Sequence, residues 1–364
     1  MARPLKGLRA RYRRTGADGP YGDPTGAHDV AMEGYFWRFT TSEAATAIVL
    51  AGINRDTTGR HWTTLGVADH PGGHLAVTAV DGGRAGPDGI DAQVCGPLLT
   101  APDRNAHFTG TAEHVRVDMP GAHVDVRVRG LRGYPAGLRH PFGGSSIFQT
   151  VPGLNQYWHP WALGGRADGV VVVDGSEILL EDAEVYAEKN WGREGFPDSW
   201  WWGQAQGFGD GACVAFAGGQ VTAGPLRTEV TAVVVALPDG QVLRVGDPVV
   251  SPVRAEITGE RWRLLGRDRT WTVLVHGEGP LEQAHVLPVP LPSRRRNTAG
   301  AVEHLGARMS VSVWRRGCRV WSGTSVTAGL EHGGRARTEA ELRRRGAPAG
   351  VIAAVPSRRL PATV

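Results

Sequence analysis

Residues 114–129 read HVRVDMPGAHVDVRVR, and this stretch decides the fold. Apolar side chains alternate with polar ones on both sides of Pro120-Gly121, namely Val115, Val117 and Met119 before it and Val124, Val126 and Val128 after it. Strict alternation is typical of a half-buried β-strand, and a Pro-Gly pair is a turn signal. The stretch therefore predicts a β-hairpin.

The same pattern recurs along the chain. Further hairpins are expected over residues 170–180, 228–245, 261–276 and 309–322. Helical periodicity is limited to residues 3–12 and 338–345, and the Pro- and Arg-rich residues 287–296 are interpreted as a surface loop. Successive strands without intervening helices predict an all-β protein of antiparallel barrels or sandwiches with few short helices.

Length and composition agree with this fold class. The chain has 364 residues, which favours two domains of about 150 residues each and also allows a single large β domain. Its 52 glycines and 24 prolines favour many turns over long helices. With 41% hydrophobic and 21% charged residues, wholesale disorder is excluded.

The positive charge is concentrated at the start of the chain. Residues 1–16 carry six Lys and Arg side chains and no acid, although the whole chain has a net charge of only +4. The rest is therefore slightly acidic, which argues against a nucleic-acid-binding domain. Residues 1–20 are predicted to form a flexible basic tail that makes at most a peripheral contact with a membrane.

No familiar cofactor, metal or targeting motif is found. The three cysteines are scattered, which argues against a disulfide framework and against a thiolate zinc site. The glycine-rich residues 207–211 precede a strand pattern, whereas a dinucleotide loop must open a helix. The first residues lack the apolar core of a signal peptide, so a cytoplasmic protein without metal or cofactor is expected.

The most informative segment is rich in tryptophan. Residues 158–202 contain six of the twelve tryptophans. In a strand over residues 184–190, one face would carry Glu184, Tyr186, Glu188 and Asn190. This face could simply contact solvent, but the surrounding indoles favour a cavity that holds carboxylic acids among aromatic rings.

Such a cavity would suit acid chemistry on an apolar substrate. Apolar surroundings raise the pKa of a carboxylic acid, so it keeps its proton at neutral pH. Aromatic faces stabilise a nearby cation. Together these groups could protonate an isoprenoid double bond and shield the resulting cation from water.

Three motifs resemble the tocopherol cyclase family. Within residues 157–208 they read YWHPWALGGRADG, AEVYAEKNWG and FPDSWWWGQAQGF. Residues 32–38, MEGYFWR, resemble the N-terminal box of that family, and residues 330–334, LEHGG, resemble its glycine-flanked glutamate. The Asn-Trp-Gly tripeptide at 190–192 is also similar to the related carotenoid hydratase and Diels–Alderase group.

The resemblance implies a fold and an activity. The fold would be two lipocalin-like β-barrels, one over residues 21–165 and one over residues 166–364. The activity would be a cofactor-independent cyclisation, in which an alkene of a prenylated hydroquinone is protonated and a phenolic oxygen closes a chromanol ring. The expected partner is thus a small prenylated aromatic or isoprenoid molecule.

The candidate site residues follow from the strand face and the matching motifs. Glu188 is predicted to be the proton donor, with Glu184 as the rival on the same face. The other predicted catalytic residues are Tyr186, Asn190, Glu33 and His159. The predicted substrate-binding residues are Trp158, Trp191, Trp200, Trp202, Glu184, Gln204 and Glu331.

Two alternative functions stay open. A lipocalin-like protein could bind an isoprenoid quinol without converting it, and a related enzyme could add water to the cation. Turnover of the ligand separates the binder from the enzymes. Product mass separates the enzymes, because cyclisation leaves the mass unchanged and hydration adds water.

Overall fold

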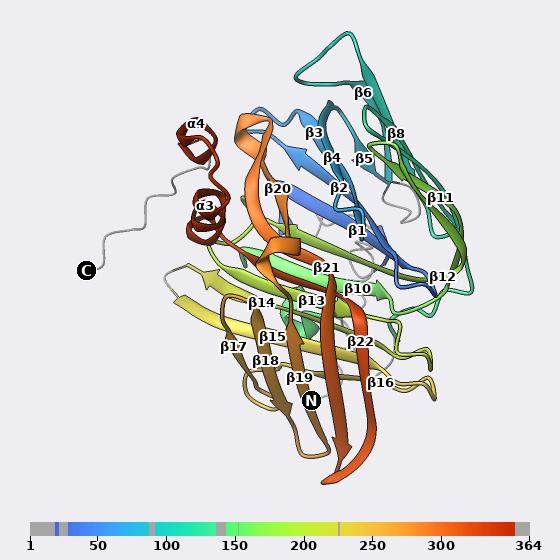
Figure 1. The fold of residues 1–364 in the computed structure, drawn as a ribbon. Coiled ribbons are helices and arrows are strands. Elements are labelled where there is room, and N and C mark those ends of the chain that lie inside the picture. Colours follow the sequence, from blue (N-terminus) through green and yellow to red (C-terminus); the bar gives the residue numbers. More distant parts are fainter. Residues whose placement is uncertain are drawn as a thin grey trace.

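A computed structural model describes residues 19–21, 28–86, 92–135, 143–151, 153–224 and 226–353. Within them the chain forms two large β-sheets with few short helices (Figure 1). The all-β prediction is therefore confirmed. The helix expected at residues 3–12 lies outside the described residues, as does all but the end of the tail predicted over residues 1–20.

The first sheet has twelve strands, in the order β4-β3-β2-β1-β12-β11-β9-β8-β7-β6-β5, with β10 paired to β12. An isolated bridge between Val80 and Leu98 joins the β4 side to the segment after β6, so the sheet curls back on itself. Its strands are β1 (Met32–Thr40), β2 (Thr46–Arg55), β3 (His61–His70), β4 (Leu75–Asp81), β5 (Arg84–Ala85), β6 (Ala92–Pro97), β7 (Asn105–Gly110), β8 (His114–Met119), β9 (Ala122–Arg129), β10 (Gln156–Ala162), β11 (Arg166–Val173) and β12 (Ser176–Gly192).

The second sheet has ten strands, in the order β16-β15-β14-β13-β22-β21-β19-β18-β17, with β20 paired to β21. Its strands are β13 (Trp200–Ala205), β14 (Cys213–Ala223), β15 (Leu226–Ala236), β16 (Val242–Val245), β17 (Val253–Ile257), β18 (Arg261–Arg267), β19 (Trp271–Glu278), β20 (His285–Leu291), β21 (Arg296–Arg315) and β22 (Cys318–Gly333). The helical elements are the 3₁₀ turns η1 (Ser146–Thr150), η2 (Leu281–Gln283) and η3 (Pro292–Arg294) and the helices α3 (Arg335–Arg344) and α4 (Ala349–Ala353). No helix within the described ranges has the length and apolar character to cross a membrane.

The predicted hairpins form as expected. β8 and β9 pair antiparallel across the Pro120-Gly121 turn, where Gly121 has a φ of +83°. A side chain would be strained in this left-handed conformation, so glycine allows the tight reversal that fixes the hairpin register. The other predicted hairpins also form, as β11–β12, β15–β16, β18–β19 and β21–β22.

Two predictions about organisation are wrong. The boundary expected between residues 165 and 166 falls inside the first sheet, because β11 pairs with β9 and β12 pairs with β1. The first sheet thus extends to Gly192, and β13 begins the second sheet at Trp200. Residues 287–296 were expected to form a loop, but His285–Leu291 is strand β20, which tolerates its two prolines because it lies off the main path of the sheet.

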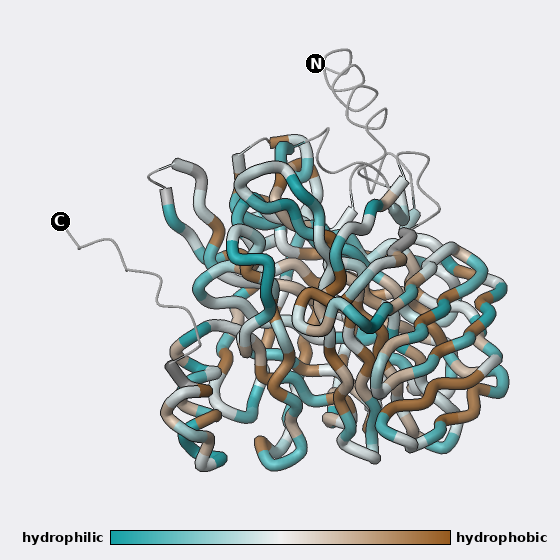
Figure 2. Tube along the Cα trace, turned by 90° about the horizontal axis from the view of Figure 1, so that it is seen from above, coloured by the Kyte–Doolittle hydropathy of each residue, from teal (hydrophilic) through white to brown (hydrophobic). Residues whose placement is uncertain are grey.

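Each sheet encloses its own apolar core. On β1, the side chains of Tyr35, Trp37 and Phe39 pack into the core of the first sheet. The core of the second sheet contains Trp262 and Met309 among others. Hydrophobic stretches follow the strands, and the peripheral turns are mostly hydrophilic (Figure 2).

The faces of β1 and β12 that point away from the first core are also buried. Phe36, Arg38 and Tyr186 lie on this side. Two apolar clusters join the sheets there: one contains Tyr186 and Val234, and the other contains Ile48 and Leu305. A cavity forms in this contact zone between the two sheets.

Candidate active site

A cavity of about 560 Å³ lies between the two sheets. The first sheet lines it with residues of β1, β2, β3, β10 and β12, and the second with residues of β13, β14, β15, β16, β20, β21 and β22. Most of the lining side chains are apolar or aromatic, and among them Phe36 packs edge-on against Trp202 with ring centroids 5.2 Å apart. Three glutamates also line this wall: Glu188, Glu303 and Glu331.

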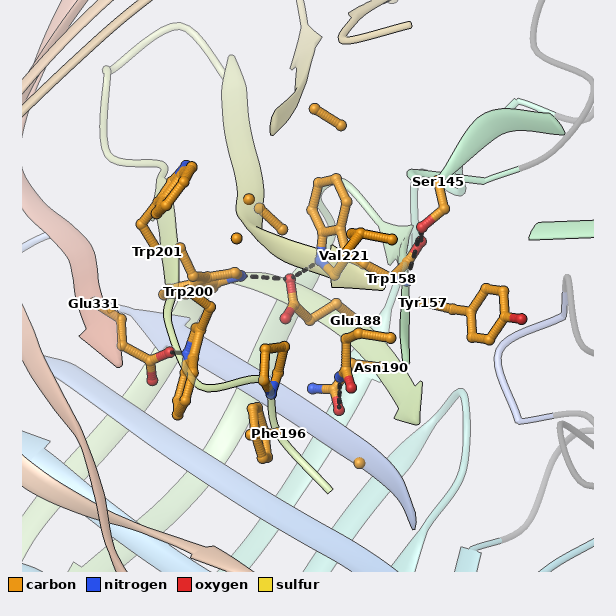
Figure 3. Close-up of a pocket in the computed structure, with 18 of the residues that line it drawn as sticks. Ser145, Tyr157, Trp158, Glu188, Asn190, Phe196, Trp200, Trp201, Val221 and Glu331 are labelled. Carbon is orange, nitrogen blue, oxygen red and sulfur yellow. Dashed lines mark hydrogen bonds between the residues drawn. The ribbon is translucent and has the colours of Figure 1, made fainter. Parts of the chain in front are cut away.

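Glu188 is held by three donors. Its Oε2 accepts hydrogen bonds from the hydroxyl of Tyr186 at 2.5 Å, from Nε1 of Trp158 at 2.7 Å and from Nε1 of Trp202 at 2.8 Å. Tyr186 is two residues away on β12, so both side chains point to the same face of the strand. Trp158 lies on β10, beside β12 in the first sheet, and Trp202 lies on β13 of the second sheet. Figure 3 shows the hydrogen bond between Trp158 and Glu188. The carboxyl group is therefore fixed in orientation.

Burial makes Glu188 an acid at neutral pH. Only 4% of the residue is exposed. Burial raises the pKa of Glu188 to about 7, although the three hydrogen bonds favour the ionised form and oppose the rise. A large fraction of Glu188 therefore carries a proton at neutral pH.

A second pair of carboxyl groups comes from the other sheet. Glu303 on β21 and Glu331 on β22 are direct cross-strand partners. Nε1 of Trp200 donates a hydrogen bond to Oε1 of Glu331, as Figure 3 shows. The Trp200 indole can reach Glu331 because it lies over Gly333, its cross-strand partner. Any larger residue at position 333 would clash with it, since a Cβ added there would lie 1.9 Å from the indole ring.

Burial also favours protons on this pair. It raises the pKa of Glu331 to about 7, opposed by the bond from Trp200 and reinforced by the nearby charge of Glu188. It raises the pKa of Glu303 well above the usual range, with a further contribution from the charge of Glu331, while Arg38 opposes the rise. Burial lowers the pKa of the Arg38 guanidinium to about 10, so Arg38 remains charged at neutral pH.

Seven of the predicted site residues come together here. Asn190 lines the cavity near Gln156, whose Nε2 lies 3.4 Å from Oδ1 of Asn190. Tyr186 lies behind the wall and contacts the cavity through Glu188. The others that line the cavity are Glu188, Trp158, Trp200, Trp202 and Glu331.

Three predicted residues point the wrong way. Glu33 pairs with Trp191 and His159 pairs with Lys189. In an antiparallel sheet, direct partners share a face, and adjacent residues on a strand point to opposite faces. Glu33 and Trp191 therefore lie on the side opposite Gly34 and Asn190, and none of Glu33, His159 and Trp191 lines the cavity.

These three have structural contacts instead. Glu33 accepts a hydrogen bond of 2.5 Å from the hydroxyl of Tyr35. Trp191 stacks on Tyr157 with ring centroids 5.5 Å apart and donates from Nε1 to Nδ1 of His28. His159 packs edge-on against Tyr134 with ring centroids 5.6 Å apart.

Glu184 and Gln204 also lie away from the cavity wall. The backbone N–H of Gly207 donates to Oε2 of Glu184 at 2.5 Å, so this carboxylate holds the segment after β13. Gln204 is fully buried, with its Nε2 3.6 Å from Sγ of Cys213. Neither is in a position to contact a molecule in the cavity, so both assignments are corrected.

The sequence reasoning missed Glu303 and Arg38. Both charges occur in apolar strand segments, and both are nearly inaccessible to solvent. A charged residue that interrupts an apolar run is the signal that could have identified them, because a buried charge needs a partner. Within the described ranges, no group of three His, Cys, Asp or Glu side chains is arranged to hold a metal ion.

The hydrogen bonds to Glu188 give a direct prediction. Trp202→Phe keeps a ring but removes one donor to the ionised carboxylate, so the pKa of Glu188 should rise from its value of about 7. Infrared titration of the protonated-carboxyl band, assigned with a Glu188→Gln variant, measures this shift. Trp201→Phe is the matched control, because Nε1 of Trp201 donates to Thr231 and not to Glu188. An equal shift in both variants would contradict the assignment.

A known protein matches a short part of the sequence. The chain is similar to a probable chloroplastic tocopherol cyclase of Oryza sativa subsp. japonica, with 39% identity over 59 residues. That match covers 16% of this chain and only 12% of the rice protein.

Two crystal structures share the architecture. CghA superposes with a TM-score of 0.51 at 15% identity, over 84% of this chain and 88% of CghA. CghA with Sch210972 gives a TM-score of 0.50 at 15% identity, over 86% of this chain and 89% of that one. At this identity the similarity concerns the fold alone.

The family assignment rests on a longer match. The model of the tocopherol cyclase-like family matches residues 125–334, which include the Glu188 strand and end at the glycines after Glu331. This range is more than half of the 364 residues, and the chain therefore belongs to the tocopherol cyclase-like family.

Proposed function

We propose that the protein is a cofactor-independent cyclase that closes a prenylated hydroquinone, or a similar aromatic isoprenoid, to a chromanol-type ring. The observation that carries the proposal is the buried, hydrogen-bonded Glu188 on the wall of an apolar cavity. The family assignment supports the same class of reaction.

The hydrogen bonds at Glu188 indicate where the acidic proton lies. All three donors contact Oε2, and no described residue donates to Oε1. Oε2 thus acts as the carbonyl-like acceptor, and the proton belongs on Oε1. The donors hold the group in one orientation, as a general acid requires.

The cavity wall suits the cation that protonation creates. The indoles of Trp158 and Trp202 contact the acid, and Trp200 lines the same cavity beside Glu331. Indole faces attract positive charge. The volume of about 560 Å³ lies within the usual range of small-molecule sites, roughly 300–1,000 Å³. Apolar walls also exclude the water that would otherwise capture the cation.

The proposed reaction is an isomerisation. Oε1 of Glu188 gives its proton to the less substituted carbon of the alkene, and the neighbouring carbon becomes a tertiary cation. A phenolic oxygen then forms a C–O bond to that carbon and loses its own proton. One proton enters and one leaves, so the product has the mass of the substrate.

The test uses phytyl- and geranylgeranyl-substituted hydroquinones incubated with the protein in D₂O. The expected product is a chromanol that carries one carbon-bound deuterium and is otherwise isomeric with the substrate. A product heavier by one water would identify a hydratase. Tight binding without any product would identify a carrier, and either outcome would overturn the cyclase proposal.

A further inference from the structure

The carboxyl pair Glu303–Glu331 lies on the wall that the second sheet contributes, whereas Glu188 belongs to the first sheet. A cyclisation needs two proton transfers, one to carbon and one from oxygen. The mechanism above assigns a residue to the first transfer only. The pair is available for the second.

The two carboxyl groups are placed to share a proton. They are direct cross-strand partners on the cavity wall, and a hydrogen bond between them needs one of the two to be protonated. The environment favours Glu303 as the protonated member, because Glu331 already accepts a hydrogen bond from Trp200. Two adjacent carboxyl groups that cannot both ionise commonly hold one proton between them.

Arg38 balances the remaining negative charge. Its guanidinium is fully buried, and Nη2 donates to the backbone oxygen of Leu305 at 2.7 Å and to that of Thr327. These bonds place the cation beside β21 and β22, where it interacts with Glu303. With one proton and one neighbouring cation, the pair can keep a carboxylate in a buried site.

One oxygen of the pair has unused hydrogen-bonding capacity. Glu303 is 2% exposed and lines the cavity, and its Oε1 has no hydrogen-bond partner within the part of the chain that the structure describes. A buried polar atom without a partner is costly. A hydroxyl group of a molecule in the cavity would satisfy it.

We propose, on the basis of the cyclase function above, that Glu331 is the catalytic base that accepts the phenolic proton and that Glu303 positions it. As the phenolic oxygen attacks the tertiary cation, the C–O bond forms and the O–H bond breaks. The O–H electron pair stays on oxygen, and the proton moves to the Glu331 carboxylate. Glu188 has lost a proton and Glu331 has gained one, so proton exchange with solvent restores both before the next turnover.

This arrangement also explains how a hydroxyl group competes with water. The base and the unpaired Oε1 of Glu303 orient the substrate hydroxyl at one side of the cavity, while the acid acts from the other sheet. An oriented internal nucleophile has a large kinetic advantage over free water. The carboxyl pair would thereby direct the cation to the ring-closed product.

The test separates protonation from ring closure. Glu331→Gln and Glu303→Gln are compared with the parent protein on a phytyl-substituted hydroquinone in D₂O. Deuterium that enters recovered substrate reports reversible protonation by Glu188, and chromanol formation reports closure. Circular dichroism and binding of the hydroquinone, followed by tryptophan quenching, confirm that each variant is folded and occupied.

In Glu331→Gln, closure should fall by about 10²-fold or more, the effect of losing a general base, while deuterium exchange continues. Glu303→Gln should also slow closure, but by a smaller factor than Glu331→Gln, because its amide can still donate to Glu331 while the proton shared by the pair is lost. The assignment would be overturned if Glu331→Gln closes the ring at the normal rate, or if it loses exchange and closure equally. It would also be overturned if Glu303→Gln is as defective in closure as Glu331→Gln. A parent protein that neither exchanges nor closes would instead refute the proposed function.

Discussion

Replacing Glu188 with Gln is expected to slow ring closure of prenylated hydroquinones by about 10²–10⁴-fold, the usual contribution of a general acid. Gln keeps the size of the side chain and can still accept hydrogen bonds from Tyr186, Trp158 and Trp202. It cannot supply a proton to carbon, so deuterium exchange into the substrate should be lost together with closure. Single-turnover rates measure the effect, and equilibrium binding of the hydroquinone should change little.

Glu184→Gln is the matched control for Glu188→Gln. Glu184 is on the same strand but binds the backbone N–H of Gly207 away from the cavity. This variant should therefore keep its rate of closure, with at most a loss of stability. A normal rate for Glu188→Gln together with a slow Glu184→Gln would move the acid to Glu184. If neither variant is slow, the binding-protein alternative is favoured.

The hairpins could be predicted because their signals are local. Alternation and a glycine turn fix the register of β8 with β9 within sixteen residues of sequence. The pairing of β1 with β12 joins residues about 150 positions apart, and no local pattern specifies it. The domain boundary was misplaced for this reason, since the pairings of β12 with β1 and of β11 with β9 assign both strands to the first sheet.

The centre of the site could also be predicted, since Tyr186 and Glu188 follow from period-two alternation beside clustered tryptophans. The same alternation places Trp191 on the face opposite Glu188, and it separates His159 from Trp158. Assigning all of them to one cavity ignored strand geometry. Glu33 was different, because excluding it required its register with Trp191, which only the folded chain supplies.

The location of the cavity needed the structure as well. A lipocalin-like barrel suggests a ligand inside the barrel, but both barrel interiors here are filled by packed side chains. The cavity lies between the outer faces of the two sheets, so an acid from one sheet can act with a carboxyl pair from the other. Catalysis would therefore depend on how the two halves are held together.

Arg38 links the two halves of the protein beside the carboxyl pair. It belongs to β1 of the first sheet, yet its guanidinium donates to backbone oxygens of β21 and β22 in the second. It also compensates the charge of the Glu303–Glu331 pair. Removing one member of a buried charge cluster commonly costs about 3–5 kcal/mol, because the remaining charge loses its partner.

Arg38→Met should therefore destabilise the protein in a pH-dependent way. At about pH 5 the pair is protonated, and the loss should be about 1–3 kcal/mol for the two backbone oxygens left without a donor. Without Arg38 the pKa values of the pair rise further above those of the unfolded chain. Above pH 7 the folded variant still holds protons that the unfolded chain has lost, so the stability of the variant falls as the pH increases past 7.

The loss should thus reach about 3–5 kcal/mol at about pH 8.5, as measured by urea unfolding of both proteins at each pH. Adding Glu303→Gln to Arg38→Met removes one titrating carboxyl group and should abolish most of the pH-dependent part, while the loss at about pH 5 stays. A loss for Arg38→Met that is the same at both pH values would mean that Arg38 acts only through its hydrogen bonds. In that case the carboxyl pair does not rely on Arg38 to keep its negative charge, and Glu331 would need another source of stabilisation to serve as a base.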